Sequence, residues 1–488
     1  MEMSSSRFDR LVGSGVVSLV LFLVAACGSA PKEQGDQTGV GEGRPNVILV
    51  TFCTMRADRI GTYGGGELTP AIDGLAQEGL VFRNHYTQAS FSGASFASII
   101  TGKYPFGHGI YDHPRKLDQD NLTLAELFKG AGYATGAFLT HPYLRPKWHY
   151  LQGLDIYSGH DLTQLSMEAV SHRPAGKPAQ QATEALKWAA GLGDEPFFMW
   201  YQTQLSHYFP KAESPFVSSV HLEAAKRFRD RVNKPSRSQI MFAFDDLEVP
   251  PEEKEGLMAT YDGAVAKSDH LLGRLLAGLE EMGRYSNTIV VVTADHGETL
   301  GEQGLFFNHD SNLLEPTIRI PFVLRIPGGP NGNIDAITRN IDLMPTLGAL
   351  AGLDLPTDLH GQSLTPLIEG KAMSLPAFSE TRPRVADRGD FDRYRLRVPG
   401  VEGKTRSIRK DNYKLILYPT PGGYDLELFD LETDPAESAN LAEELPEVAK
   451  GLAWRLEEWF SNYADADVMP LDLDEEDLES LRALGYID

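Results

Sequence analysis

Apolar and polar positions along the chain follow two patterns, and together these patterns predict a layered α/β fold. Residues 47–50 are apolar at every position, which is typical of a strand buried on both faces of a sheet. Residues 197–201 and 288–293 have the same strand-like character. Leucines recur at helical spacing over 271–279, and we interpret this stripe as core packing rather than a binding face. Buried strands that alternate with helices predict a mostly parallel central sheet sandwiched by helices.

Local signals place two helices close to these strands. Thr69 can cap a helix whose first position is Pro70, and Gly79 is expected to end it. Thr123 and Glu126 have the spacing of a capping box, so a second helix should begin there.

Beyond about residue 375 the pattern changes to the alternation of antiparallel strands. Apolar and polar residues alternate over 413–418 and 426–429, with a Pro-Gly-Gly turn at 421–423. A helical pattern follows at 448–460. We therefore expect a small C-terminal antiparallel sheet with a helix. Residues 210–251 are rich in charge and poor in periodicity, which indicates an insertion over one end of the large sheet.

Composition limits the classes of function. The 488 residues carry 45 Lys and Arg against 68 Asp and Glu, a formal charge of −23, so the chain lacks the basic field of a nucleic-acid-binding protein. A hydrophobic content of 42% supports a large core and excludes general disorder. The two cysteines are too few for a disulfide scaffold.

The N-terminus has the pattern of an export signal. Arg7 and Arg10 precede an apolar run over 11–26, and the small residues before Cys27 resemble a bacterial lipobox. The alternative is an ordinary signal peptide with an incidental cysteine. The lipobox implies a lipid on Cys27, a membrane anchor and a location in the cell envelope, on its periplasmic or outer-membrane face. We predict a signal peptide at 1–26, a flexible tether at 27–44, a catalytic domain at 45–375, and a C-terminal subdomain and tail at 376–488.

Residues able to do chemistry follow the predicted strands. Cys53, the pair Asp295-His296 and His207 all come shortly after a strand, and strand ends in a parallel sheet share one crevice. An adjacent carboxylate and imidazole suit a divalent cation, although a surface turn with a capping Asp gives the same dipeptide. Ser92 begins a small-residue stretch that could open a helix against an anion, but capping serines are common.

The ordered set of motifs resembles the sulfatase family, within the alkaline-phosphatase-like superfamily. The resemblance runs from Asn46 to the end of the chain. It rests on residues 46–58, 69–73, 92–102, 104–109, 293–298, 304–309, 318–321, 342–346, 360–364, 428–441 and 484–486.

The resemblance implies an alkaline-phosphatase-like fold and metal-dependent hydrolysis of a sulfate ester. The substrate would be a small-molecule or glycan anionic ester, and the cation would usually be Ca²⁺. It places Ser92 as the nucleophile and Asp295 and His296 as metal ligands. His309 would contact the bridging oxygen of the ester, and His207 would protonate the leaving group.

The chain departs from the family pattern at three places. Cys53 replaces a metal-binding carboxylate, so either the cation is Zn²⁺ or Mn²⁺ or the site is weakened. Ala94 and Phe96 replace the Pro and Arg of the formylglycine signature, so we expect Ser92 to remain a hydroxyl. His141 partly substitutes for a Lys-and-His pair that binds substrate. Two alternatives stay open: a phosphate or phosphonate ester hydrolase or transferase using unmodified Ser92, and a catalytically degenerate binding protein.

Overall fold

The central strand β1 (Asn46–Phe52) is buried along its whole length and pairs in parallel with β6 (Phe197–Thr203) and β7 (Thr288–Ala294). The structure is a computed structural model and describes residues 43–112, 115–158, 160–161, 177–207, 215–231, 249–382, 403–420 and 423–461. The predicted signal peptide and Cys27 lie outside these residues, as do residues 484–486. The predicted domain limits stay predictions.

The large sheet is mixed but mostly parallel, as the sequence predicts. Its order in the described residues is β10 (Gly332–Arg339), β2 (Leu80–Tyr86), β9 (Phe322–Arg325), β7, β1, β6, β3 (Ala134–Phe138), β4 (Ile156–Tyr157) and β5 (His160–Asp161), with β8 (Arg319–Ile320) paired to β2. Strand β9 runs antiparallel to both β2 and β7. The strands predicted at 47–50, 197–201 and 288–293 are confirmed as β1, β6 and β7.

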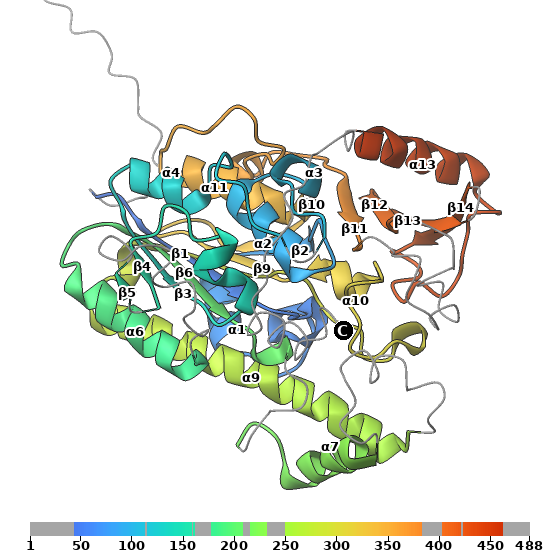
Figure 1. Ribbon diagram of the computed structural model, residues 1–488, viewed down its shortest axis with the longest axis horizontal. Coiled ribbons are helices and arrows are strands. Elements are labelled where there is room, and N and C mark those ends of the chain that lie inside the picture. The colour runs from blue at the N-terminus through green and yellow to red at the C-terminus, as the bar shows by residue number, and fades with distance from the viewer. Residues whose placement is uncertain are drawn as a thin grey trace, which may run out of the picture. The chain divides into compact units, whose positions relative to one another are not determined.

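Helices cover both faces of this sheet (Figure 1). One face packs against α2 (Ser92–Thr101), α4 (Leu124–Gly130), α11 (Leu343–Leu350) and α12 (Thr365–Ile368). The other packs against α1 (Pro70–Glu78), α6 (Pro178–Gly191) and α9 (Pro251–Glu281). Side chains of β1 alternate between them, with Val47 and Leu49 in one core and Ile48 and Val50 in the other. The leucine stripe of α9 is core, as predicted.

The remaining helical segments are short or peripheral. They are α3 (Pro105–His108), α7 (Ser219–Arg231), α10 (Glu315–Ile318), α13 (Pro446–Phe460) and the 3-10 turns η1 (Ala57–Arg59), η2 (Gly61–Tyr63), η3 (Pro142–Leu144), η4 (Pro146–Trp148), η5 (Leu205–His207), η6 (Tyr285–Asn287), η7 (Glu302–Gly304) and η8 (Asn340–Asp342). Among the described residues, no helix is both long and apolar enough to cross a membrane.

The C-terminal antiparallel sheet is also present. Its order is β11 (Ala377–Glu380), β12 (Arg406–Lys410), β13 (Tyr413–Thr420) and β14 (Gly423–Asp430), and all three pairings are antiparallel. Helix α13 packs against it through buried Leu452, Leu456 and Trp459. Strand β11 also contacts the segment before α2, because the Glu380 backbone N–H donates to the Gln88 carbonyl and the Ser90 N–H donates to the Glu380 carbonyl.

One local prediction needs correction. The predicted capping box at Thr123 is confirmed, but Thr69 makes no side-chain capping bond to α1. Instead, the Asp269 carboxylate on α9 accepts the first N–H groups of α1. Gly79 ends the helix as predicted, in an extended conformation; a side chain there would lie 2.5 Å from the Leu324 carbonyl oxygen of β9.

The charged segment predicted as an insertion contains regular structure. Part of it, residues 208–214 and 232–248, lies outside the described residues. The described part forms α7, whose buried Ala224, Ala225 and Phe228 lie on the side facing α9. Gly256 of α9 permits this approach, since a side chain there would lie 2.7 Å from Ala224. The segment therefore includes an amphipathic helix that sequence periodicity missed.

Candidate active site

Predicted site residues follow the ends of four neighbouring strands. Cys53 directly follows β1, and Asp295 directly follows β7. His207 lies in η5 after β6, and His141 lies shortly after β3. Because β3, β6, β1 and β7 are adjacent and parallel, their carboxyl ends meet at one edge of the sheet.

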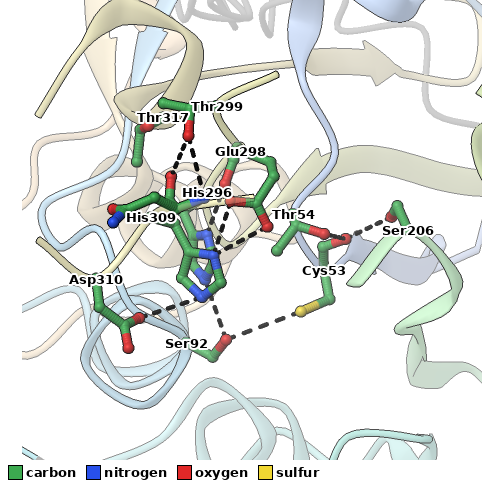
Figure 2. A network of polar contacts seen from close by, with 12 residues as sticks. Cys53, Thr54, Ser92, Ser206, His296, Glu298, Thr299, His309, Asp310 and Thr317 are labelled. Atoms are coloured by element: carbon green, nitrogen blue, oxygen red, sulfur yellow. Dashed lines mark hydrogen bonds and ion pairs between the residues drawn. The ribbon is translucent and has the colours of Figure 1, made fainter. Parts of the chain in front are cut away.

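Ser92 reaches this edge from the first turn of α2. Its Oγ lies 3.1 Å from His296 Nε2 and 3.8 Å from Cys53 Sγ, and all three residues are fully buried (Figure 2). Residues 39, 204 and 243 positions apart in the sequence therefore meet at one point. The structure brings the predicted nucleophile together with the predicted metal ligands.

Asp295 has one satisfied and one unsatisfied carboxylate oxygen. Its Oδ1 accepts the backbone N–H of Thr54 at 2.9 Å and of His296 at 2.7 Å. Its Oδ2 is buried without a hydrogen-bond partner and lies 3.5 Å from His296 Nε2. An unpaired buried carboxylate oxygen is costly, so this atom requires a positive partner.

The tautomer of His296 is set by the backbone. Its Nδ1 lies 2.9 Å from the Gly297 carbonyl oxygen, which can only accept, so Nδ1 carries the proton. The lone pair of a neutral ring then sits on Nε2, facing Asp295 Oδ2. Two acceptors that face each other repel, and a cation between them removes this repulsion. A backbone carbonyl holding the far nitrogen is also the usual support of a metal-bound imidazole.

These residues fit a divalent cation. The ligand atoms of Cys53, Asp295 and His296 all lie within 4.8 Å of one another and are buried. A thiolate, a carboxylate and an imidazole form a donor set that suits Zn²⁺. Ca²⁺ prefers six to eight oxygen ligands. The donor chemistry therefore fits a thiophilic cation better than Ca²⁺.

His309 lies beside this group and between two carboxylates. Its ring stacks on His296 with 4.3 Å between ring centroids. Both Glu298 oxygens lie close to its Nδ1, at 3.0 and 3.1 Å, and Asp310 Oδ1 lies 3.1 Å from its Nε2. The contact of Nδ1 with Glu298 is a hydrogen bond, whereas the contact of Nε2 with Asp310 is at ion-pair distance.

Two further histidines extend the row away from the metal ligands. The ring centroid of His207 lies 5.4 Å from that of His309 and 6.2 Å from that of His141. His141 Nδ1 accepts the backbone N–H of Tyr143 at 3.2 Å, so this nitrogen is used in capping η3. The His207 ring thus contacts His309, whose ring stacks on His296.

The positions that depart from the formylglycine signature are filled by apolar packing. Ala94 and Phe96 are fully buried in α2. The Phe96 ring meets His141 and Trp200 edge-on, with centroid distances of 5.4 and 5.9 Å. A charged side chain in place of Phe96 would be buried against these two rings, which is costly unless it is paired.

Sequence reasoning missed the residues that hold in place the loop from Asp295 to His309. Glu298 orients His309, and Arg56 ties that loop to the end of β1 by donating to the Glu298 carbonyl at 3.1 Å. Arg56 is buried, which lowers its pKa, but the carboxylates of Asp58 and Glu302 outweigh burial and raise that pKa above its ordinary value. The adjacent Asp-His-Gly-Glu residues gave a signal for Glu298, but no sequence signal pairs Arg56 with a loop about 240 positions away.

Comparisons with known proteins identify the family of this chain. The family model "Sulfatase" matches residues 45–353, and "N-sulphoglucosamine sulphohydrolase, C-terminal" matches 301–462. The chain is 24% identical to N-acetylglucosamine-6-O-sulfatase of Bacteroides thetaiotaomicron, over 93% of this chain and 91% of the relative.

Two solved structures share the fold. The phosphonate monoester hydrolase of Agrobacterium radiobacter superposes with a TM-score of 0.65 at 23% identity, covering 86% of this chain and 96% of that one. A protein solved with its substrate D-glucosamine-2-N,6-O-disulfate superposes with a TM-score of 0.64 at 23% identity, covering 87% and 99%.

Proposed function

This chain belongs to the sulfatase family, and we propose that it hydrolyses a sulfate ester with Ser92 as the nucleophile. One observation carries the proposal: Ser92 Oγ lies 3.1 Å from His296 Nε2, beside a carboxylate oxygen of Asp295 that lacks a partner. The substrate class we infer is a sulfated small molecule or glycan. The N-acetylglucosamine-6-O-sulfatase relative and the neighbour solved with a disulfated glucosamine support this choice.

The described side chains suggest how the reaction proceeds. A cation held by Cys53, Asp295 and His296 would offset the charge of the sulfate group and favour the deprotonated form of Ser92. Ser92 Oγ, after losing its proton to solvent, forms a bond to sulfur while the bond from sulfur to the ester oxygen breaks. Water then attacks the sulfur of the serine sulfate, which releases hydrogen sulfate and returns a proton to Ser92 Oγ. His207 gives its proton to the departing alkoxide, and His309 donates to the same bridging oxygen.

We further propose that the cation is Zn²⁺, with Mn²⁺ as the next candidate. Sulfatase-family members typically use a divalent cation, usually Ca²⁺. The sulfur of Cys53 is a soft ligand in a place where that hard ion needs oxygen. The proposal therefore keeps the family's site and changes its ion.

A second candidate is hydrolysis or transfer of a phosphate or phosphonate ester by unmodified Ser92. The observation that favours it is the apolar packing of Ala94 and Phe96, which leaves the formylglycine signature incomplete. A serine sulfate cannot collapse to an aldehyde and must be cleared by a second displacement. Phosphoryl chemistry with a plain hydroxyl nucleophile meets no such obstacle.

Mass spectrometry of the Ser92 peptide after incubation with substrate separates these candidates. Serine sulfate or formylglycine at this position supports sulfate chemistry, and phosphoserine supports the phosphoryl alternative. Turnover of aryl sulfates, phosphodiesters and phosphonates should be measured with Ca²⁺, Mn²⁺ and Zn²⁺. Ser92→Ala should abolish it. Ser98→Ala is the matched control in the same helix, because Ser98 contacts His108 of α3, and it should not abolish turnover. No turnover with any ester or ion would favour a degenerate binding protein.

We also propose that a lipid on Cys27 anchors the chain in the cell envelope. The basic residues Arg7 and Arg10, the apolar run and the small residues before Cys27 support this. Labelling with a radioactive fatty acid should mark the protein, and Cys27→Ala should remove the label. An unlabelled wild-type protein in the soluble fraction would contradict the anchor.

A further inference from the structure

The side of His309 that faces away from Glu298 is already occupied by a carboxylate of the chain itself. Glu298 holds Nδ1, so Nε2 is the nitrogen able to reach a substrate. Asp310 Oδ1 lies 3.1 Å from that Nε2, and Figure 2 shows Asp310 and Glu298 on opposite sides of the ring. An ester that His309 is to contact must therefore compete with Asp310.

The second oxygen of Asp310 pairs with a residue from the C-terminal sheet. Asp310 Oδ2 lies 3.3 Å from Arg382 Nη1, and the Arg382 backbone N–H donates to the Asp310 carbonyl at 3.2 Å. Arg382 comes two residues after β11, and Nε of its guanidinium lies 3.6 Å from Asp112 Oδ1. The carboxylate of Asp310 thus bridges an imidazole and a guanidinium.

This bridge has the form of a bound oxyanion. The two oxygens of a carboxylate are separated by one atom, as are two oxygens of a sulfate or phosphate group. Arginine forks are well matched to such pairs of oxygens. The charge of Asp310 also repels an anionic ester, whereas the charge of Arg382 attracts it.

The side-chain exposures of these charged residues allow Asp310 to move away from His309. His309 is fully buried, whereas the exposed fractions of the side chains rise to 17% for Asp310, 23% for Arg382 and 33% for Asp112. The Asp310 carboxylate can therefore be displaced outward into water, and Arg382 can stay at the position it now holds.

We propose that Asp310 occupies the place of the substrate's oxyanion between His309 and Arg382, and that Arg382 binds this oxyanion once Asp310 swings out. The proposal rests on the proposed function for the role of His309. It adds a substrate-binding residue from the C-terminal sheet and an internal carboxylate that must be displaced.

Titration with inorganic sulfate and, separately, inorganic phosphate tests this without turnover. Calorimetry should compare the wild type with Asp310→Asn, Arg382→Gln and Asp112→Asn in the same metal state. Asp310→Asn should tighten anion binding about tenfold, because it removes a competing charge. Arg382→Gln should weaken it about tenfold, because it removes a charged donor. Asp112→Asn should change it about twofold or less, because exposed pairs are weak.

The two variants should change anion affinity in opposite directions, and a purely structural role of Asp310 and Arg382 would not produce this difference. If Asp310→Asn and Arg382→Gln both weaken binding, or if neither changes it, the proposal is overturned. Thermal melts should show that each variant is folded. If Arg382→Gln is not, Arg382→Lys serves instead and should weaken binding about threefold, because it keeps the charge without the fork. Failure of the hydrolase proposal would appear as absent turnover, with these affinity changes intact.

Discussion

Replacing Cys53 with Asp tests whether one sulfur atom decides which cation the site holds. Cys53 is fully buried at the end of β1, and its Sγ lies within 4.8 Å of the ligand atoms of Asp295 and His296. The change swaps a soft ligand for a hard carboxylate at this position. It should weaken Zn²⁺ binding and create affinity for Ca²⁺.

The magnitude follows from the number of ligands. Zinc bound by four protein ligands in small domains releases about 10–16 kcal/mol, or about 3 kcal/mol per ligand. Loss of the thiolate should therefore weaken Zn²⁺ binding about a hundredfold. At a concentration of about a hundred times Kd, a bound ion stabilises the fold by about 2.7 kcal/mol. For a chain of 488 residues this raises Tm by roughly 3 °C.

The assay measures metal content by mass spectrometry together with melting temperature. Wild-type protein should melt about 3 °C higher with Zn²⁺ and be unaffected by Ca²⁺, and Cys53→Asp should reverse that preference. Cys53→Ala is the control, because it removes the sulfur without adding oxygen and should bind both ions weakly. If Zn²⁺ binds Cys53→Ala as tightly as the wild type, or if Ca²⁺ stabilises the wild type, the reasoning about Cys53 is refuted.

Three further predictions concern the residues that support the site and the core. Glu298→Gln should lower turnover about 10- to 100-fold by loosening His309, whereas Glu302→Gln in the same loop should have little effect, which steady-state kinetics will show. Burial raises the pKa of Asp269 to about 6, so its contribution to stability is full below its unfolded pKa near 3.8 and is lost as pH rises through 6. Between pH 5 and pH 8 the wild type should therefore lose about 1 kcal/mol more stability than Asp269→Asn, measured by urea denaturation at each pH. Leu275→Ala should destabilise the fold by about 2–5 kcal/mol, since this side chain is fully buried between α9 and the sheet.

Each of these has a contrary outcome. Equal losses for Glu298→Gln and Glu302→Gln would mean that the loop matters as a whole and the contact with His309 does not. A larger loss of stability between pH 5 and pH 8 in Asp269→Asn than in the wild type would show that the sign is wrong. A change below 1 kcal/mol for Leu275→Ala would contradict its place in the core.

Local sequence pattern was sufficient for the elements whose burial is uniform or periodic. Strands β1 and β7 are buried on both faces, so their central positions, 47–50 and 289–292, are all apolar and the pattern is unambiguous. The Thr123 capping box was also predictable, because all its hydrogen bonds lie within four residues. The hydrophobic pattern did not reveal α7, because its charged residues outnumber the buried apolar residues that face α9.

The sequence by itself determined the fold class, which strands along the chain are followed by reactive side chains, and the identity of those side chains. The tertiary structure alone decided how they meet. Asp269 caps α1 from about 200 positions away, and Arg382 reaches Asp310 across 72 positions. Whether Cys53, Ser92 and His296 share one point likewise depends on the packing of two strands and a helix. Hydrogen bonds and ion pairs between such distant residues have no fixed spacing in the chain, so only the folded arrangement specifies them.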